Sequence, residues 1–149
     1  MKTPRLWKRE DGSALVEFAL ILPILVLLLV GMMEFGLILY NQHVITNASR
    51  EGARFGIVAA TDRKDATEIT DVVEHYCLNN LITFGTALPV TEVKVFDSDG
   101  AEITTDAASF SDDLRVTVTF EYKFLVLPNF IGSLAGIMNL RAETTMKYE

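Results

Sequence analysis

This chain has few residues that would cross-link it or interrupt its N-terminal half. Cys77 is its only cysteine, so no disulfide can form within the chain. A domain outside the cytoplasm would then be stabilised by its hydrophobic core alone. No proline occurs between Pro23 and Pro89, so a helix can continue through these residues without a break. The sequence therefore permits a long first helix and excludes a disulfide-stabilised fold.

Charge is almost absent from the segment that follows the first dozen residues. From Ser13 to Met33 the only charged residue is Glu17. Residues 14–33 make about 30 Å of helix, which matches the hydrocarbon thickness of a bilayer. Pro23 lies within this run, and membrane helices tolerate proline better than soluble ones. The segment is predicted to span a membrane.

The leader before Gly12 is mainly basic, with Lys2, Arg5, Lys8 and Arg9 against Glu10 and Asp11. By the positive-inside rule the N-terminus stays in the cytoplasm and the chain leaves it C-terminally. A removed secretory signal peptide is the competing interpretation. The apolar run is too long for a typical signal, and no small-x-small cleavage site follows it. We therefore expect the segment to stay in the membrane.

Basic residues are scarce in the rest of the chain. From residue 61 to residue 149 there are fifteen acidic and seven basic residues, a net charge of −8. Nucleic-acid phosphates require the opposite sign, so nucleic acid is not an expected partner. This acidic part is predicted to be a soluble domain.

The first helix is predicted to continue beyond the membrane to about Ala60. An apolar stripe with a period near 3.6 runs through Leu37, Tyr40, Val44 and Ile45. Small residues then recur every fourth position, which permits close helix packing: Ala48, Gly52, Gly56 and Ala60. This face could pack against the chain's own C-terminal sheet or against a neighbouring subunit.

A second helix and about three strands are predicted after residue 60. Asp65 and Glu68 have the spacing of a capping box, and the helix is expected to end near Asn79 and Asn80. Strict alternation of apolar and polar residues from Leu114 to Phe124 predicts a strand with one buried and one wet face. Alternation also predicts strands at Val93–Val95 and Met138–Tyr148. The fold class is α+β, with a small antiparallel sheet on the outer half of the long helix.

One connection between the predicted strands is unusually apolar. Six of the eight residues from Leu125 to Gly132 are apolar or proline. The segment could contact a partner or the membrane surface, or it could fold over the edge of the sheet.

Few residues suggest metal binding or catalysis. Glu74, His75 and Cys77 are metal-ligand types, but i and i+2 point to different sides of a helix. No metal, no cofactor and no enzymatic activity are predicted. Arg50 and Arg54 share one helix face, with Glu51 between them, and are expected to form ion pairs with the acidic domain.

Gly12, four residues and then Glu17-Phe18 ahead of an apolar helix resemble the processing site of a type IVb prepilin. Together with the residues that follow, this motif makes the chain resemble the TadE-like family, pilin-like proteins (pseudopilins) of bacterial tight-adherence (Tad) pili. The block Arg50-Glu51-Gly52-Ala53-Arg54 makes the resemblance more specific, because the cleavage pattern alone fits several pilin classes.

The resemblance implies a minor pseudopilin that a prepilin peptidase cuts between Gly12 and Ser13. Its partners would be this peptidase, other pilins, the Tad secretion machinery and the lipid bilayer. The implied division is a leader at 1–12, a transmembrane helix at 13–36, its extramembrane continuation at 37–60 and a periplasmic domain at 61–149. The protein would sit in the inner membrane and enter the extracellular pilus on assembly. The alternative is an uncleaved single-pass anchor with a periplasmic binding domain.

Glu17 is the residue that most needs an explanation. A charge at the bilayer centre costs roughly 2.5–3.5 kcal/mol on insertion scales, and less near the interface. After cleavage, Glu17 could pair with the α-amine of Ser13 in its own chain or in a neighbour, and the second pairing would set the register of a filament. Without pairing, Glu17 would extend to the headgroups.

Overall fold

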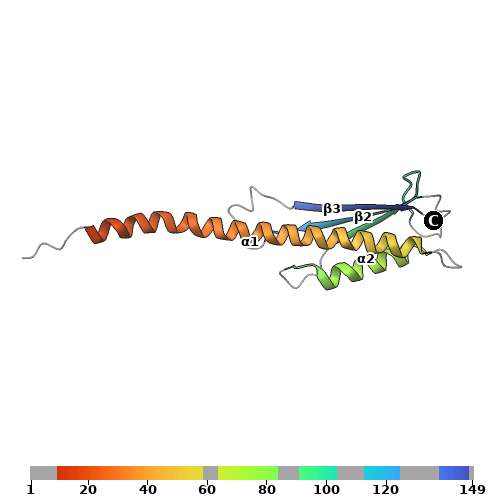
Figure 1. Cartoon of the computed structure of the whole chain (residues 1–149), viewed down its shortest axis with the longest axis horizontal. Coiled ribbons are helices and arrows are strands. Elements are labelled where there is room, and N and C mark those ends of the chain that lie inside the picture. The colour runs from red at the N-terminus through yellow and green to blue at the C-terminus, as the bar shows by residue number, and fades with distance from the viewer. Residues whose placement is uncertain (1–9, 59–63, 84–90, 104–112, 125–137, 148–149) are drawn as a thin grey trace, which may run out of the picture.

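The computed structural model describes residues 10–58, 64–83, 91–103, 113–124 and 138–147. Its elements are α1 (Glu10–Ile57), α2 (Ala66–Asn80), β1 (Thr91–Phe96), β2 (Asp113–Tyr122) and β3 (Met138–Lys147). Figure 1 shows α2 and the sheet gathered around the C-terminal half of α1, while its N-terminal half projects alone. The α+β prediction is confirmed.

Helix α1 has 48 residues and is about 70 Å long at 1.5 Å per residue. It includes Pro23 and contains a stretch long and apolar enough to cross a membrane, none of which is buried against the rest of the chain. The helix ends at Ile57, three residues before the predicted end. Ala60 and the remaining predicted turn lie outside the described residues.

Helix α2 begins and ends as the sequence predicts. The backbone N–H of Asp65 donates a hydrogen bond of 3.3 Å to the Glu68 carboxylate, which is one half of the capping box. The buried residues of α2 are Ala66, Ile69, Val73 and Cys77. Cys77 continues the i+4 spacing of Ile69 and Val73 and is fully buried with them.

The three strands form one antiparallel sheet in the order β1-β2-β3. Strand β2 pairs with β1 through Val95–Val116 and with β3 over ten positions, from Asp113–Lys147 to Tyr122–Met138. Gly100 closes the turn after β1 with a φ of 79°, which favours glycine. Its N–H donates to the carbonyl of Asp97.

The core lies between the outer half of α1, α2 and one face of the sheet. From β2 it receives the alternating apolar residues Leu114, Val116, Val118, Phe120 and Tyr122. The opposite face of β2 is drier than predicted, because Thr117 is buried and its polar neighbours are only partly exposed. The apolar segment Leu125–Gly132 lies outside the described residues.

Candidate functional site

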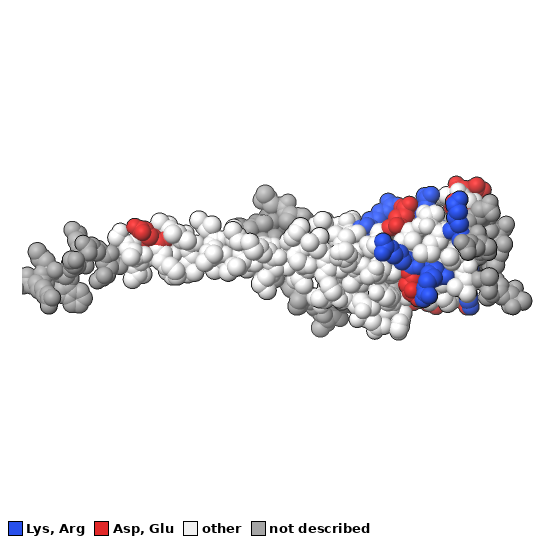
Figure 2. All heavy atoms as spheres, viewed as in Figure 1, with Lys and Arg blue, Asp and Glu red and all other residues white. Residues whose placement is uncertain are grey.

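The prepilin-like motif lies on the part of α1 that no other described element touches. We call residues 12–33 the bare half of α1 and residues 34–57 the packed half. Gly12, Ser13, Glu17 and Phe18 are all exposed, and a Cβ added at Gly12 would meet no atom within 4 Å. Figure 2 shows one acidic patch on this bare half, and Glu17 is the only charged residue from Ser13 to Met33. Nothing in the described chain covers the motif.

Ser13 and Glu17 lie one helical turn apart on the same side of α1. The Ser13 hydroxyl is 3.5 Å from a Glu17 carboxylate oxygen, at the limit of a hydrogen bond. The helix begins at Glu10, so the bond between Gly12 and Ser13 lies in its first turn. The Glu17 side chain is therefore directed toward the residue that would become the N-terminus after cleavage.

The small-residue face packs against the chain's own domain. Ala48, Gly52 and Gly56 are buried. A Cβ at Gly52 would collide with Val73 of α2, and one at Gly56 would lie 2.8 Å from Ile69 Cδ1 and collide with Leu114 of β2. The sequence left open whether this face packs against the chain's own sheet or against a neighbouring subunit. In the structure it packs against the chain's own domain, and both α2 and the sheet take part.

The block from Arg50 to Arg54 divides between two sides of the helix. Gly52 and Ala53 face the core, whereas Arg50 and Arg54 are exposed. Arg54 forms a salt bridge of 2.7 Å with Glu51 of its own helix, and this hydrogen bond lowers the pKa of Glu51. Within the part of the chain that the structure describes, Arg54 therefore pairs inside its own helix and not with the domain. Among the described residues Arg50 forms no ion pair at all.

Glu34 is the residue whose role the sequence left undetected. The sequence places it near the outer end of the membrane span, but the structure buries it to 1% exposure. The Tyr122 hydroxyl donates to its carboxylate at 2.6 Å, and burial together with this bond raises the pKa of Tyr122. The only available signal was that Glu34 precedes Asn41 and Ala48 at heptad spacing, on what proved to be the buried face.

Further polar contacts fasten the packed half to the domain. The Asn41 side chain both donates to and accepts from the backbone of Ile82, at 3.0 Å in each direction. Gln42 donates to the Arg141 carbonyl at 3.0 Å, and Ser49 shares a hydrogen bond of 2.8 Å with Thr144. Buried polar groups need such partners, so these bonds specify how the domain sits on α1.

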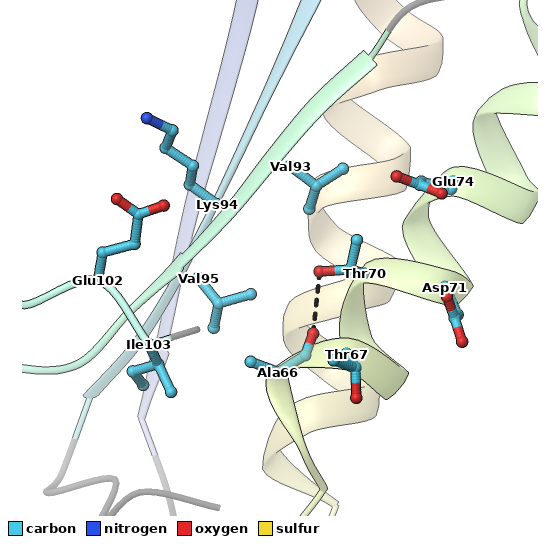
Figure 3. A pocket seen from close by; sticks show the side chains of 10 residues that line it. All are labelled: Ala66, Thr67, Thr70, Asp71, Glu74, Val93, Lys94, Val95, Glu102 and Ile103. Carbon is cyan, nitrogen blue, oxygen red and sulfur yellow. Dashed lines mark hydrogen bonds between the residues drawn. The ribbon is translucent and has the colours of Figure 1, made fainter. Parts of the chain in front are cut away.

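A cleft of about 350 Å³ separates α2 from β1 (Figure 3). Thr70 bonds back to the Ala66 carbonyl at 2.9 Å rather than into the cleft. The carboxylates of Asp71, Glu74 and Glu102 point in different directions in Figure 3 and do not converge on one point. Among the described residues no group of three or more acidic, histidine or cysteine side chains is placed to hold a metal ion.

Comparison with known proteins gives one match. Residues 12–54 match the family model described as TadE-like protein. The match confirms the resemblance over the bare half and most of the packed half, and a TadE-like match suggests involvement in the Tad pilus system. It covers less than a third of the chain and stops before α2 and the sheet. No curated protein and no solved structure matches the chain significantly.

Proposed function

We propose that this chain is a minor pseudopilin, processed by a prepilin peptidase and then assembled into, or initiating, a Tad pilus. The observation that carries the proposal is the family match over residues 12–54, which includes both the cleavage motif and the Arg50–Arg54 block. The architecture supports it, because an apolar helix projects from a folded domain that covers only its outer half. The role is structural and uses no cofactor and no catalytic group.

The exposure of Gly12 supports processing at this position. The peptidase would hydrolyse the peptide bond between Gly12 and Ser13, releasing a carboxylate on Gly12 and an α-amine on Ser13. No described part of the chain obstructs this bond. Residues 1–12 would leave on the cytoplasmic side, and the domain would stay in the periplasm until assembly.

The position of Glu17 supports a role in assembly. A free α-amine has a pKa near 7.7–8.0, so the new N-terminus would be largely cationic at neutral pH. In lipid the Glu17 carboxylate needs such a partner. The contact between Ser13 and Glu17 makes pairing within one chain geometrically accessible, and pairing with a neighbour's amine would fix the axial register of a filament.

Intact mass after co-expression with a Tad-type prepilin peptidase tests processing. The expected result is loss of residues 1–12, leaving Ser13 as the N-terminus. Gly12→Ala is the control and should remain full length beside the active peptidase. A full-length wild-type chain under the same conditions would contradict the proposal and favour the uncleaved anchor.

Substitution of Glu17 tests assembly separately from processing. Both Glu17→Ala and Glu17→Gln should be cleaved normally but should fail to support pili, because neither retains the charge. Leu20→Ala, an exposed residue of the same bare half, is the matched control. Normal pili with Glu17→Gln would refute charge pairing, and cleavage would then remain the only function of the motif.

A further inference from the structure

The two lateral edges of the folded domain carry opposite charge. Helix α1 packs on β2 and β3, whereas α2 packs on β1, so we call the two sides the α1–β3 edge and the α2–β1 edge. On the α2–β1 edge, residues 64–83 and 91–103 include eight acidic and two basic residues. The packed half of α1 and β3 carry four basic residues against two exposed acidic ones, and Figure 2 shows basic atoms over the outer end of α1.

Arg50 is the basic residue of the α1–β3 edge with no counter-charge from its own chain. It is exposed, and no residue that the structure describes forms an ion pair with it. It lies about two turns beyond Gln42, which bonds to β3, so it belongs to the β3 side of α1. On β3 itself, the Glu143 carboxylate is shared between two arginines, Arg115 at 3.5 Å and Arg141 at 3.1 Å. This edge therefore has positive charge left over.

Asp71 and Glu74 are the corresponding carboxylates on the opposite edge. Both line the cleft between α2 and β1 (Figure 3), and within the described part of the chain neither forms an ion pair. Their height along α1 follows from the close approach of the two helices, because a Cβ at Gly52 would collide with Val73. Glu74 is the next residue of α2, so it lies within about one helical turn of the height of Arg50.

The sheet repeats this arrangement on the face that points away from the helices. Thr119 of the central strand pairs with Glu92 of β1 on one side and with Arg141 of β3 on the other. Glu92 and Arg141 therefore lie in one row across the sheet, at opposite edges and at the same height, and each side chain is 64% exposed. Their ion pairs with Lys94 and Glu143 lie in water, where such pairs are weak enough to be shared with a neighbour.

Copies of the chain that span one membrane stand at the same depth, because the apolar bare half fixes each helix in the bilayer. A sideways shift then brings the α1–β3 edge of one copy to the α2–β1 edge of the next without axial displacement. We propose that a second copy of the chain docks in this way, with Arg50 of one copy opposite Asp71 and Glu74 of the other. On the sheet side, Arg141 lies opposite the neighbour's Glu92.

The occupant is a second copy because the match in charge and height is between two edges of the same chain. The membrane has already removed much of the freedom that association in solution would cost. The contact joins two different edges, so it is heterologous and can continue from copy to copy. It requires membrane insertion but neither cleavage after Gly12 nor a pilus, so its failure and the failure of the proposed function are separate outcomes.

Energy transfer between labelled copies in phosphatidylcholine vesicles tests this contact. The full chain with Cys77→Ala and Ala101→Cys carries a single exposed cysteine for a donor or an acceptor dye. We expect energy transfer between wild-type copies that falls as salt rises, because exposed charges are screened beyond about 10 Å at 0.1 M. Arg50→Glu, and separately Asp71→Lys combined with Glu74→Lys, should each weaken association about fivefold or more, because repulsion replaces attraction.

An equimolar mixture of these two variants is the decisive sample. The reversed α1–β3 edge of one variant then meets the reversed α2–β1 edge of the other, and the remaining edges are unchanged, so energy transfer should return to the wild-type level. Lys123→Glu, which follows the central strand β2, makes the same change of net charge as Arg50→Glu and should leave association unchanged. Near-UV circular dichroism would verify the fold of every variant.

Three outcomes would overturn the proposal. A mixture that associates no better than either variant alone would mean that the two edges do not meet. Equal losses for Arg50→Glu and Lys123→Glu would assign the effect to net charge. Absence of energy transfer between wild-type copies at low salt would mean that the chain does not pair with itself in the membrane.

Discussion

The two halves of α1 belong to one continuous helix but meet different surroundings. From Gly12 to Met33 no side chain is buried, and large apolar residues occur on every side. From Glu34 to Ile57 one face is buried and carries small and polar residues, among them Asn41, Ala48 and Gly52.

The contrast shows how one continuous helix can be adapted to two different surroundings. The bare half has no partner within the described chain, so lipid or other subunits must cover its apolar surface. The packed half obtains a core from its own chain, and it needs small residues to admit α2 and polar residues to fix the domain's position. Each of the following tests compares a residue that contacts the domain core or a specific partner with a matched control, and all unfolding is followed by near-UV circular dichroism of tyrosine in detergent.

The largest expected difference concerns core volume. Ile69 is fully buried beneath the packed half, so Ile69→Ala should lower the free energy of unfolding by about 2–5 kcal/mol. Leu25→Ala, in the bare half, should leave domain unfolding within about 0.5 kcal/mol of wild type. Equal losses would mean that the bare half contributes to the domain core.

Alkaline pH provides the second comparison. Burial and the nearby Glu74 raise the pKa of the Cys77 thiol from 9.0 to about 11. The folded state thus favours the neutral thiol, and this stabilisation is complete below pH 9 and lost as the pH rises toward 11. At 1.36 kcal/mol per pKa unit the loss is about 2–3 kcal/mol. Urea unfolding with reductant should show this extra decline in wild type and not in Cys77→Ala.

The bond to Glu34 is the third test. Tyr122→Phe removes a hydrogen bond to a buried carboxylate and should cost about 1.5–3 kcal/mol. The matched control is Tyr40→Phe, an exposed tyrosine of α1, which should change stability by less than about 0.5 kcal/mol. If Tyr122→Phe were as mild as its control, this hydrogen bond would not be what holds the sheet on α1.

Glycine substitutions in α1 are expected to give a smaller difference in stability. Gly52→Ala gains helix propensity of about 1 kcal/mol but forces a methyl group into Val73, which typically costs about 1–3 kcal/mol. Gly36→Ala gains the same propensity with no atom within 4 Å of the new methyl group. Thermal unfolding should therefore rank Gly36→Ala above wild type and Gly52→Ala below it. The reverse order would contradict the close approach of α2 to α1.

The smallest effect is expected at the exposed ion pair. Arg54→Ala breaks the salt bridge with Glu51, but both side chains are largely in water, where such pairs contribute little. Its unfolding midpoint should match that of Arg50→Ala within error. A clear loss for Arg54→Ala alone would assign the pair a structural role.

Much of this fold could be predicted, because helix caps and strand alternation depend on residues that are close together in the sequence. The capping spacing of Asp65 and Glu68 located the start of α2, and alternation located β2 and β3. The dry outer face of Thr117 escaped prediction, because it depends on neighbouring strands that are distant in the sequence. The cleavage motif of Gly12 and Glu17 could be read directly, since it lies in a segment without tertiary contacts.

From the sequence alone we could predict the apolar span, the helix and strand types, and the resemblance to the TadE-like family over the N-terminal part of the chain. Helix and strand periodicity and hydropathy are properties of short segments, so no tertiary information was needed. The three-dimensional structure was needed to show that Gly52 and Gly56 pack against the chain's own domain and that Tyr122 covers Glu34. These contacts join residues up to 88 positions apart, and only the packing of α1 against the sheet brings them together.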